Sequence, residues 1–246
     1  SLLKMRNKSK IDTFRLKMND TFKYINNNYF SSYTRYRIAC IEMFAQAGSE
    51  KLFMSKYFAG QPVLLDNSGY MEFFNEFFKD YLLSGSENIS RTDLEKTING
   101  LKSYTALIDT LGKDSLLQNE VLRELVALKG LGELCENSDF DKDAILGMFN
   151  EVAGSSKFEF LKTIAKNYLI KFTSLTKGSV AASFSLRDYN GYLYSLPEFN
   201  KDKYVYLVFW TTWCIPCMEE MDLVDKLVEK YGTKVEFVGI SCDKEF

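Results

Sequence analysis

Two cysteines, Cys214 and Cys217, stand two residues apart in the stretch YVYLVFWTTWCIPCMEEM. Such a pair can be a dithiol redox centre, half of a metal site or an inert buried pair. Disulfide exchange needs a thiolate, and the unpaired N–H groups in the first turn of a helix stabilise one. A helical pattern begins directly after Cys214, and Pro216 fits a first turn because its missing N–H has no intrahelical partner there. Trp213 would add an apolar surface beside the exposed sulfur. Together these features favour a redox pair in which Cys214 is the exposed, reactive thiol and Cys217 lies one turn further in.

The chain contains no histidine, and this absence removes several classes of reaction. Ser-His and Cys-His nucleophile pairs and His-ligated zinc sites all require one. Three cysteines lie outside the pair, Cys40, Cys135 and Cys242, and they are too isolated to complete a zinc site. We therefore predict no metal and no cofactor other than a redox-active Cys214–Cys217 disulfide.

Length and composition indicate a globular protein of one or two domains, with 246 residues of which 46% are apolar. The 31 basic and 33 acidic residues leave a net charge of -2, so no basic surface for nucleic acid is expected. No apolar run reaches the roughly 18 residues that cross a bilayer. The start, SLLKMRNKSK, lacks an initiator Met and the apolar core of a signal peptide. We expect a trimmed or processed product, with any targeting segment upstream.

Most of the chain, from about residue 10 to 175, repeats its apolar residues with the spacing of helices. Helices are predicted over 31–48, 67–85, 90–112, 114–130, 141–153 and 156–174. Hydroxyl residues suited to N-caps open the first two, Thr92 and Glu95 have the spacing of a capping box, and Asp114 or Ser115 would cap the fourth. We predict an independent, mainly α domain over residues 1–176, whose role the sequence leaves open.

A stripe of aromatic residues marks the second of these helices. Its members are Tyr70, Phe73, Phe74, Phe77, Phe78 and Tyr81. Aromatic residues at helical spacing usually face a core, so we predict packing here and not a docking surface for a partner.

The segment DFDKDAILGMFN, residues 139–150, begins like a calcium-binding loop. It has Ala144 where the sharp turn needs glycine and Asn150 where the last ligand should be glutamate. We therefore predict a helix N-cap with acidic residues in the first turn, and no calcium site.

Near Lys177 the apolar pattern changes to that of strands, which predicts a second, α/β domain over residues 177–246. Its first two strands lie within FSLRDYNGYLYSL, around Asn190-Gly191, a dipeptide typical of a type I′ hairpin turn. A fully buried strand over 204–210, a helix over 215–231 and a strand over 234–241 follow. Together these three make a right-handed parallel βαβ unit. The CxxC pair stands at its strand-to-helix turn, at the sheet edge that Cys242 also reaches.

The segment KGSVAASFSLRDYNGYLYSLPEFNKDKYVYLVFWTTWCIPCMEEM resembles the opening of the thioredoxin-fold domain of TlpA/ResA-like thiol-disulfide oxidoreductases. The resemblance runs from Gly178 to about Asp243. The matching positions are Phe184, Leu186, Gly191, Leu196, Phe199 and the run FWTTWCIPC. It implies that Cys214 is the attacking thiol and Cys217 the resolving thiol. It also implies that Glu220 tunes the thiols, since it matches a family glutamate.

The same resemblance implies a function in the periplasm or cell envelope of bacteria. The activity would be reduction, or less often oxidation, of protein disulfides, with protein thiols and a membrane electron donor as partners. Any membrane tether would lie in a segment upstream, because no transmembrane segment is evident in the sequence. The helical part is similar to the N-terminal extensions of such proteins in Bacteroidetes-type bacteria. The oligomeric state is left open.

The sequence also departs from the family pattern. The usual Ala-Pro before the first strand is replaced by Ala181-Ala182. The family's cis-proline lies on a later strand, and none of Pro62, Pro197 and Pro216 can take its place. We therefore expect the thioredoxin-like domain to be incomplete in this chain, with the N-terminal hairpin and the first βαβ unit only, and the natural protein to continue.

Two other functions compete with a disulfide oxidoreductase. A peroxiredoxin would use Thr211, three residues before Cys214, but Leu207 stands at its proline position and a resolving thiol as near as Cys217 argues against it. The stronger rival is a binding module, in which the helices dock a partner or ligand and the redox half is vestigial or secondary. The helical domain fills more than half of the chain, so this second hypothesis is kept.

Overall fold

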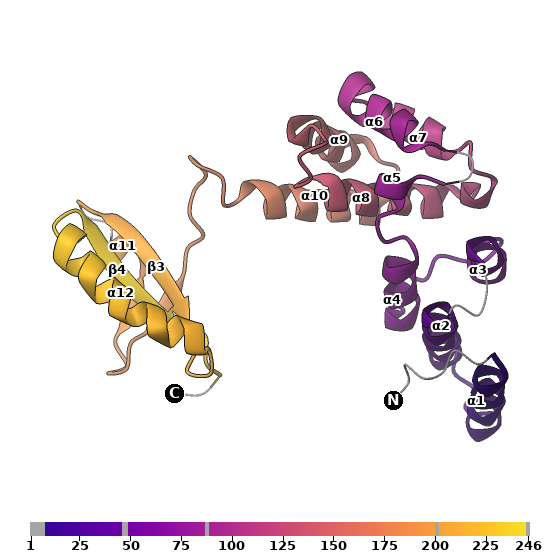
Figure 1. The fold of residues 1–246 in the computed structure, drawn as a ribbon, viewed down its shortest axis with the longest axis horizontal. Helices are drawn as coiled ribbons and strands as arrows, with labels where there is room; N and C mark the ends of the chain where they lie inside the picture. Colours follow the sequence, from indigo (N-terminus) through magenta and orange to yellow (C-terminus); the bar gives the residue numbers. More distant parts are fainter. Residues whose placement is uncertain (1–7, 46–48, 87–88, 200–201, 245–246) are drawn as a thin grey trace. The chain divides into compact units, whose positions relative to one another are not determined.

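The computed structural model describes residues 8–45, 49–86, 89–199 and 202–244. The chain forms two compact units, Ser1–Lys177 and Gly178–Phe246. The first is helical and the second combines short strands with helices (Figure 1). None of the helices in the described ranges has both the length and the apolar character that crossing a bilayer requires.

The N-terminal unit is built from helices joined by short turns (Figure 1). Its elements are α1 (Lys8–Thr21), α2 (Asn28–Phe44), α3 (Glu50–Tyr57), α4 (Ser68–Phe77), α5 (Tyr81–Ser84), α6 (Arg91–Glu95), the π-helix η2 (Lys96–Leu101), α7 (Tyr104–Leu111), the 3₁₀ turn η3 (Ser115–Leu117), α8 (Glu120–Leu134), α9 (Lys142–Ser155) and α10 (Glu159–Thr173). Helix α9 lies within two residues of its predicted range, and α10 begins three residues after its predicted start and ends one residue before its predicted end.

Polar side chains that accept a hydrogen bond from a backbone amide start most of these helices. The caps are Asn27, Ser49, Asn67, Ser90, Ser103, Asp114, Asn119 and Asp141. Each satisfies one of the N–H groups that a first turn leaves without an intrahelical partner.

Three other predicted helix starts or N-caps differ from the structure. The helix predicted from residue 31 begins at Asn28, and the end predicted at Gly48 lies outside the described residues. The capping residue of α6 is Ser90, which accepts from the amide of Asp93, and not Thr92. Asp114 caps only the short turn η3, so α8 begins five residues later than its predicted cap suggests, at Glu120.

Two predicted continuous helices, 67–85 and 90–112, are broken by residues in the left-handed region. Asp80 has φ 54° between α4 and α5, and Lys102 has φ 52° between η2 and α7. A non-glycine residue there costs on the order of 1 kcal/mol. Contacts from distant segments offset this cost, because the amide of Asp80 donates to a carboxylate oxygen of Glu133 at 3.2 Å and Lys102 pairs with Asp141 at 2.5 Å. The apolar spacing continues across both breaks, so it predicted one helix where there are two.

The predicted packing of the aromatic stripe is confirmed. All of its members are buried except Phe77, which is half-buried. Phe73 lies at the centre, with its ring 5.2 Å from the rings of both Tyr57 and Phe58. Tyr36 of α2 meets Tyr70 edge to face at 4.8 Å, so the stripe joins α4 to α2 and α3. Such ring pairs add about 0.5–1.5 kcal/mol each beyond their buried area.

Two glycines allow α8 to lie against its neighbours. A Cβ atom on Gly130 would overlap the buried side chain of Leu82 in α5, and one on Gly132 would overlap the ring of Tyr168 in α10. The pair stands in the sequence KGLGELC, within α8, where both glycines serve close helix packing. Helix α8 is therefore the element on which the second half of the helical unit is assembled.

The C-terminal unit begins with a hairpin of β1 (Ser185–Arg187) and β2 (Leu193–Ser195), followed by the short helix α11 (Leu196–Phe199). The predicted type I′ turn is wrong. The last strand pair is Arg187 with Leu193, so five residues connect the strands, and only Gly191 among them has a positive φ, of 86°. Asp188 organises this longer loop, since its carboxylate accepts from the amides of Asn190 at 2.9 Å and Tyr192 at 2.8 Å.

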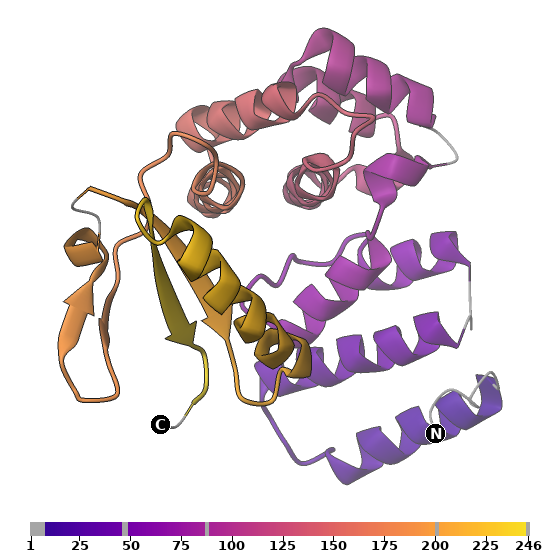
Figure 2. The same ribbon diagram turned by 60° about the vertical axis from the view of Figure 1, so that its left-hand side comes forward.

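The predicted parallel βαβ unit is present, as β3 (Tyr204–Trp210), α12 (Ile215–Tyr231) and β4 (Val235–Ser241). The strands pair in register from Tyr204 with Val235 to Trp210 with Ser241, and α12 lies across one face of the pair (Figure 2). The prediction that the first strand is fully buried is wrong, because the side chains of Tyr204, Tyr206 and Phe209 are exposed. Continuous apolar character therefore identified the strand correctly and its burial incorrectly.

Residues 1–176, expressed alone, are expected to give a helical far-UV circular dichroism spectrum and a cooperative thermal transition. The core of this unit is closed within itself, since its buried apolar residues run from Ile11 to Phe172. A domain with its own core can fold alone. A spectrum of a disordered chain would reject the predicted division at residues 176 and 177.

Candidate functional site

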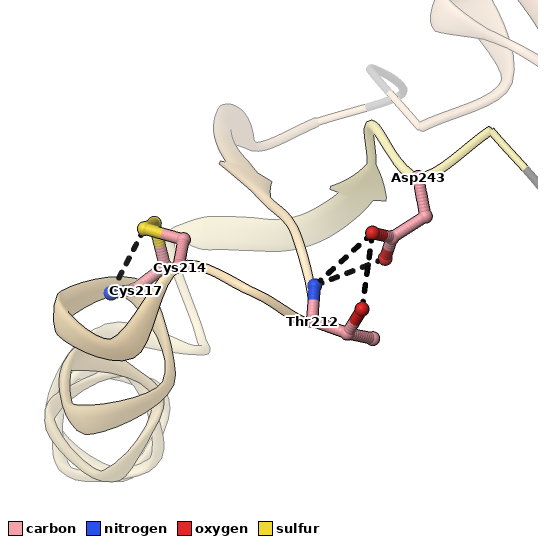
Figure 3. The surroundings of a disulfide bond; sticks show 4 residues. All are labelled: Thr212, Cys214, Cys217 and Asp243. Atoms are coloured by element: carbon pink, nitrogen blue, oxygen red, sulfur yellow. Dashed lines mark hydrogen bonds between the residues drawn. A yellow bond between two sulfur atoms is a disulfide. The ribbon is translucent and has the colours of Figure 1, made fainter.

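Cys214 and Cys217 form a disulfide at the start of α12, with their Cα atoms 5.2 Å apart (Figure 3). Cys214 is the N-cap residue, in an extended conformation, and Pro216 occupies the first turn of the helix as predicted. The amide of Cys217 donates to the Sγ atom of Cys214 at 3.3 Å. The strand-to-helix turn therefore places the first sulfur at the positive end of the helix and gives it a backbone donor.

Both cysteines are half-buried. The predicted greater exposure of the Cys214 thiol in the reduced protein stays a prediction. What distinguishes them is the backbone hydrogen bond, which only Cys214 receives among the described contacts. A hydrogen bond to the charged form of a thiol favours that form. The geometry can therefore stabilise a thiolate at Cys214 more than at Cys217.

The turn that precedes Cys214 is held to the end of β4. The amide of Cys214 donates to the carbonyl oxygen of Thr211 at 3.2 Å, which closes the turn, and Thr211 is buried. The amide of Cys242 donates to the carbonyl oxygen of Trp210 at 2.8 Å, one step beyond the strand ladder. The backbone of this turn is thus continuous with the parallel sheet.

Sequence reasoning missed Asp243, which makes the densest set of contacts near the disulfide (Figure 3). Its carboxylate oxygens accept from the amide of Thr212 at 3.0 and 3.2 Å and from the Thr212 hydroxyl at 3.1 Å. Ser241 donates its hydroxyl to the same carboxylate at 3.0 Å. A signal was available, because a serine and an aspartate end a parallel strand at the edge where the CxxC turn was placed.

The other predicted site residues have no described contact with the disulfide. Trp213 is 78% exposed, so little of its indole is packed against the turn. Glu220 is exposed on α12, and its predicted influence on the thiols stays a prediction. Cys242 is an exposed free thiol at the strand end.

Cys40 and Cys135 are buried in the helical unit. Burial raises the pKa of the Cys40 thiol to about 11 and also raises the pKa of Cys135. Both thiols therefore stay protonated at neutral pH, as expected of small apolar core residues and not of nucleophiles.

The calcium-like segment is a helix start, as predicted. Asp141 caps α9 by accepting from the amide of Ala144 at 3.1 Å. The hydrogen bond from Lys102, followed by that from the Ala144 amide, lowers the pKa of Asp141. Asp139 pairs with Arg91, and no grouping of three or more His, Cys, Asp or Glu side chains suited to a metal occurs among the described residues.

Comparisons with known proteins match the C-terminal part of the chain. Residues 178–246 match the AhpC/TSA family. The thiol-disulfide oxidoreductase ResA of Bacillus thuringiensis subsp. konkukian (strain 97-27) is 36% identical over 83 residues, which are 33% of this chain and 47% of that protein. The thioredoxin-like protein YneN of Bacillus subtilis (strain 168) is 37% identical over 76 residues, 31% of this chain and 44% of YneN.

A second ResA, from Geobacillus kaustophilus (strain HTA426), is 38% identical over 85 residues, 33% of this chain and 48% of that protein. The chain thus spans about half the length of the curated relatives it matches. No solved structure matches it. These matches fall on the C-terminal region, which holds the hairpin, the parallel βαβ unit and the CxxC turn, and this region is similar to thiol-disulfide oxidoreductases and thioredoxin-like proteins.

Proposed function

We propose that this chain belongs to a thiol-disulfide oxidoreductase that exchanges protein disulfides through Cys214 and Cys217. The observation that carries the proposal is the CxxC disulfide at the N-terminus of α12, with the Cys217 amide donating to the Cys214 sulfur. The names of the relatives, thiol-disulfide oxidoreductase and thioredoxin-like protein, support the same chemistry.

In the reducing direction the reduced pair acts in two steps. The Cys214 thiolate attacks one sulfur of a substrate disulfide, so that a mixed disulfide forms and one substrate thiolate leaves. The Cys217 thiol then loses its proton and attacks the Cys214 sulfur, which releases the second substrate thiolate and leaves the Cys214–Cys217 disulfide. The substrate has gained two electrons, and its two thiolates take up the proton lost by Cys217 and one from solvent; an external dithiol must return two electrons to the pair.

Reduction is the direction that we propose, with Cys214 attacking and Cys217 resolving. Trp213 and Glu220 would act through the turn and the helix that carry them. The partners would be protein disulfides and an electron donor in the membrane, and the location the periplasm or cell envelope. Location and donor rest on the resemblance to envelope oxidoreductases.

Insulin, as a model protein disulfide, and dithiothreitol, as the electron source, test the activity. The chain is expected to accelerate the reduction of insulin, and Cys214→Ser to return the rate to that of dithiothreitol alone. Cys217→Ser, reduced beforehand and freed of dithiothreitol, is expected to accumulate a mixed disulfide between Cys214 and insulin, because the resolving thiol is missing. Cys40→Ser is the matched control outside the site and is expected to react at the wild-type rate. Equal acceleration by wild type and Cys214→Ser would overturn the proposal.

A cavity in the helical unit favours a second candidate function, the binding of an anionic small molecule. The cavity has a volume of about 410 Å³, and its lining combines apolar side chains, such as Phe22 and Phe30, with basic ones that include Arg35. The guanidinium of Arg35 is 5.6 Å from the ring of Tyr57 and donates to the carbonyl oxygen of Lys56 at 2.8 Å. These contacts hold its position without a carboxylate partner among the described residues, so its charge is available to an anion.

The fluorescent anion anilinonaphthalene sulfonate tests this second candidate. Arg35→Gln is expected to weaken its binding several-fold, and Arg37→Gln, two residues further along α2 and outside the cavity, to leave binding unchanged. Equal affinity of wild type and Arg35→Gln would reject the cavity as an anion site.

A further inference from the structure

We propose that Asp243 is a positioning residue for the dithiol, which holds the turn before Cys214 through the backbone amide and hydroxyl of Thr212. This inference rests on the proposed function of the Cys214–Cys217 pair and assigns a residue to it from outside the CxxC motif. It concerns how the first sulfur is kept beside its backbone donor.

Thr212 lies in the turn that joins β3 to α12. Its amide lies between the end of β3 and the start of α12, where neither a strand ladder nor a helix supplies an acceptor. The Asp243 carboxylate supplies one with both of its oxygens, at 3.0 and 3.2 Å, and also binds the Thr212 hydroxyl at 3.1 Å. A carboxylate that accepts from a backbone amide makes a stronger bond than a neutral acceptor.

Asp243 is itself held in place by hydrogen bonds at the end of β4. The Ser241 hydroxyl donates to its carboxylate at 3.0 Å and accepts from its amide at 3.2 Å. The amide of the intervening residue, Cys242, donates to Trp210 O at 2.8 Å, which ties this segment to the end of β3. The carboxylate is therefore presented from a rigid strand end and not from a free chain.

The turn is linked to the sulfur through Cys214. The amide of Cys214 donates a hydrogen bond to the carbonyl oxygen of Thr211 at 3.2 Å. Thr212 lies within the turn that this bond closes, so movement of Thr212 also moves Cys214 and its sulfur. The hydrogen bond from the Cys217 amide to the sulfur, 3.3 Å long, depends on the same placement. A loosened turn would weaken that bond and the interaction of the sulfur with the helix terminus, both of which favour a thiolate.

The test measures the rate of iodoacetamide labelling of Cys214 in the reduced chain and the equilibrium of the dithiol with glutathione. All variants carry Cys242→Ser, which removes the other exposed thiol. Asp243→Ala is expected to slow iodoacetamide labelling of Cys214 at neutral pH several-fold, because a higher thiol pKa leaves a smaller fraction of Cys214 as thiolate. The equilibrium with glutathione is expected to shift toward the disulfide by a similar factor, because the reduced pair loses stabilisation. Asp225→Ala removes one exposed acidic residue from α12 and is expected to change neither quantity.

Asp243→Asn separates positioning from charge. Its amide oxygen can still accept from Thr212, so positioning predicts labelling close to the wild-type rate. A role through negative charge alone predicts faster labelling in both variants, because an anion near a thiol opposes its ionisation. That result, or unchanged labelling and unchanged glutathione equilibrium in Asp243→Ala, would overturn the inference.

A fold defect in Asp243→Ala would be seen as a lost circular dichroism signal. In that case Thr212→Val, which removes one of the hydrogen bonds and keeps the amide, is expected to slow labelling by a smaller factor, and no change would count against the inference. Labelling and glutathione equilibrium need no protein substrate. If wild type fails to reduce insulin while Asp243→Ala still slows labelling, the proposed function fails and the positioning role stands.

Discussion

Iodoacetamide is expected to label Cys214 in the reduced protein on the order of tenfold faster than Cys217 at neutral pH. Cys214 lies at the helix start and receives the amide of Cys217, whereas no described contact stabilises a second anion at Cys217. At neutral pH a larger fraction of Cys214 than of Cys217 should therefore be present as thiolate, because a backbone donor and the helix terminus favour the charged sulfur. The Cys214 rate should rise with pH and level off above its pKa, because only the thiolate reacts.

Peptide mass spectrometry across pH 5 to 9 separates the sites, and the chain offers its own control. Burial raises the pKa of Cys40 to about 11, so this thiol should stay unlabelled until the protein is unfolded. Cys242 is exposed and gives the rate of an ordinary surface thiol. Preferential labelling of Cys217, or equal rates with an apparent pKa above 8 for both, would reject the asymmetric dithiol and favour an inert pair.

Gly130→Ala is expected to lower the free energy of unfolding of the helical unit by about 1–3 kcal/mol, the usual effect of an added methyl group in a packed core. The new Cβ would overlap Leu82, whose side chain is fully buried and cannot turn away into solvent. Separation of α5 from α8 would be needed to relieve the overlap. Urea unfolding followed by far-UV circular dichroism measures the loss.

Gly147→Ala is the matched control, because this glycine also lies inside a helix, α9, and its Cβ would meet no atom within 4 Å. There alanine should raise the free energy of unfolding by about 0.5–1 kcal/mol, since it has the higher helix propensity. The two substitutions are thus expected to act with opposite signs. A stabilising Gly130→Ala would show that α5 and α8 are not packed as described.

The helical part of the fold could be predicted where each helix is stabilised by its own side chains. The apolar spacing of α9 and α10 and the Asp141 cap of α9 are local, and the predicted ranges of both helices agree with the structure to within three residues. The breaks at Asp80 and Lys102 could not be predicted, because the groups that favour them, Glu133 and Asp141, lie on other elements. Helix breaks that depend on distant partners leave no trace in the apolar spacing.

In the candidate site, too, the residues placed by local sequence could be predicted and the residue placed by a distant contact could not. Cys214 and Cys217 are neighbours in sequence, so their spacing and the helix that follows were enough to bring them together. Asp243 is separated from the turn in sequence by α12 and β4. Only the parallel pairing of Trp210 with Ser241 brings it beside the turn. The predicted type I′ turn of the hairpin was wrong for a local reason. The Asp188 carboxylate organises a longer loop than the Asn190-Gly191 dipeptide suggests.

Both tryptophans of the chain, Trp210 and Trp213, lie within four residues of Cys214, and residues 1–177 contain none. Selectively excited indole fluorescence therefore comes from the C-terminal unit alone, whereas most of the far-UV ellipticity comes from the helical unit. A single denaturant titration of the intact chain thus has a separate optical probe for each unit. Coincident curves would indicate one cooperative transition, and displaced curves would show the two units unfolding in separate steps.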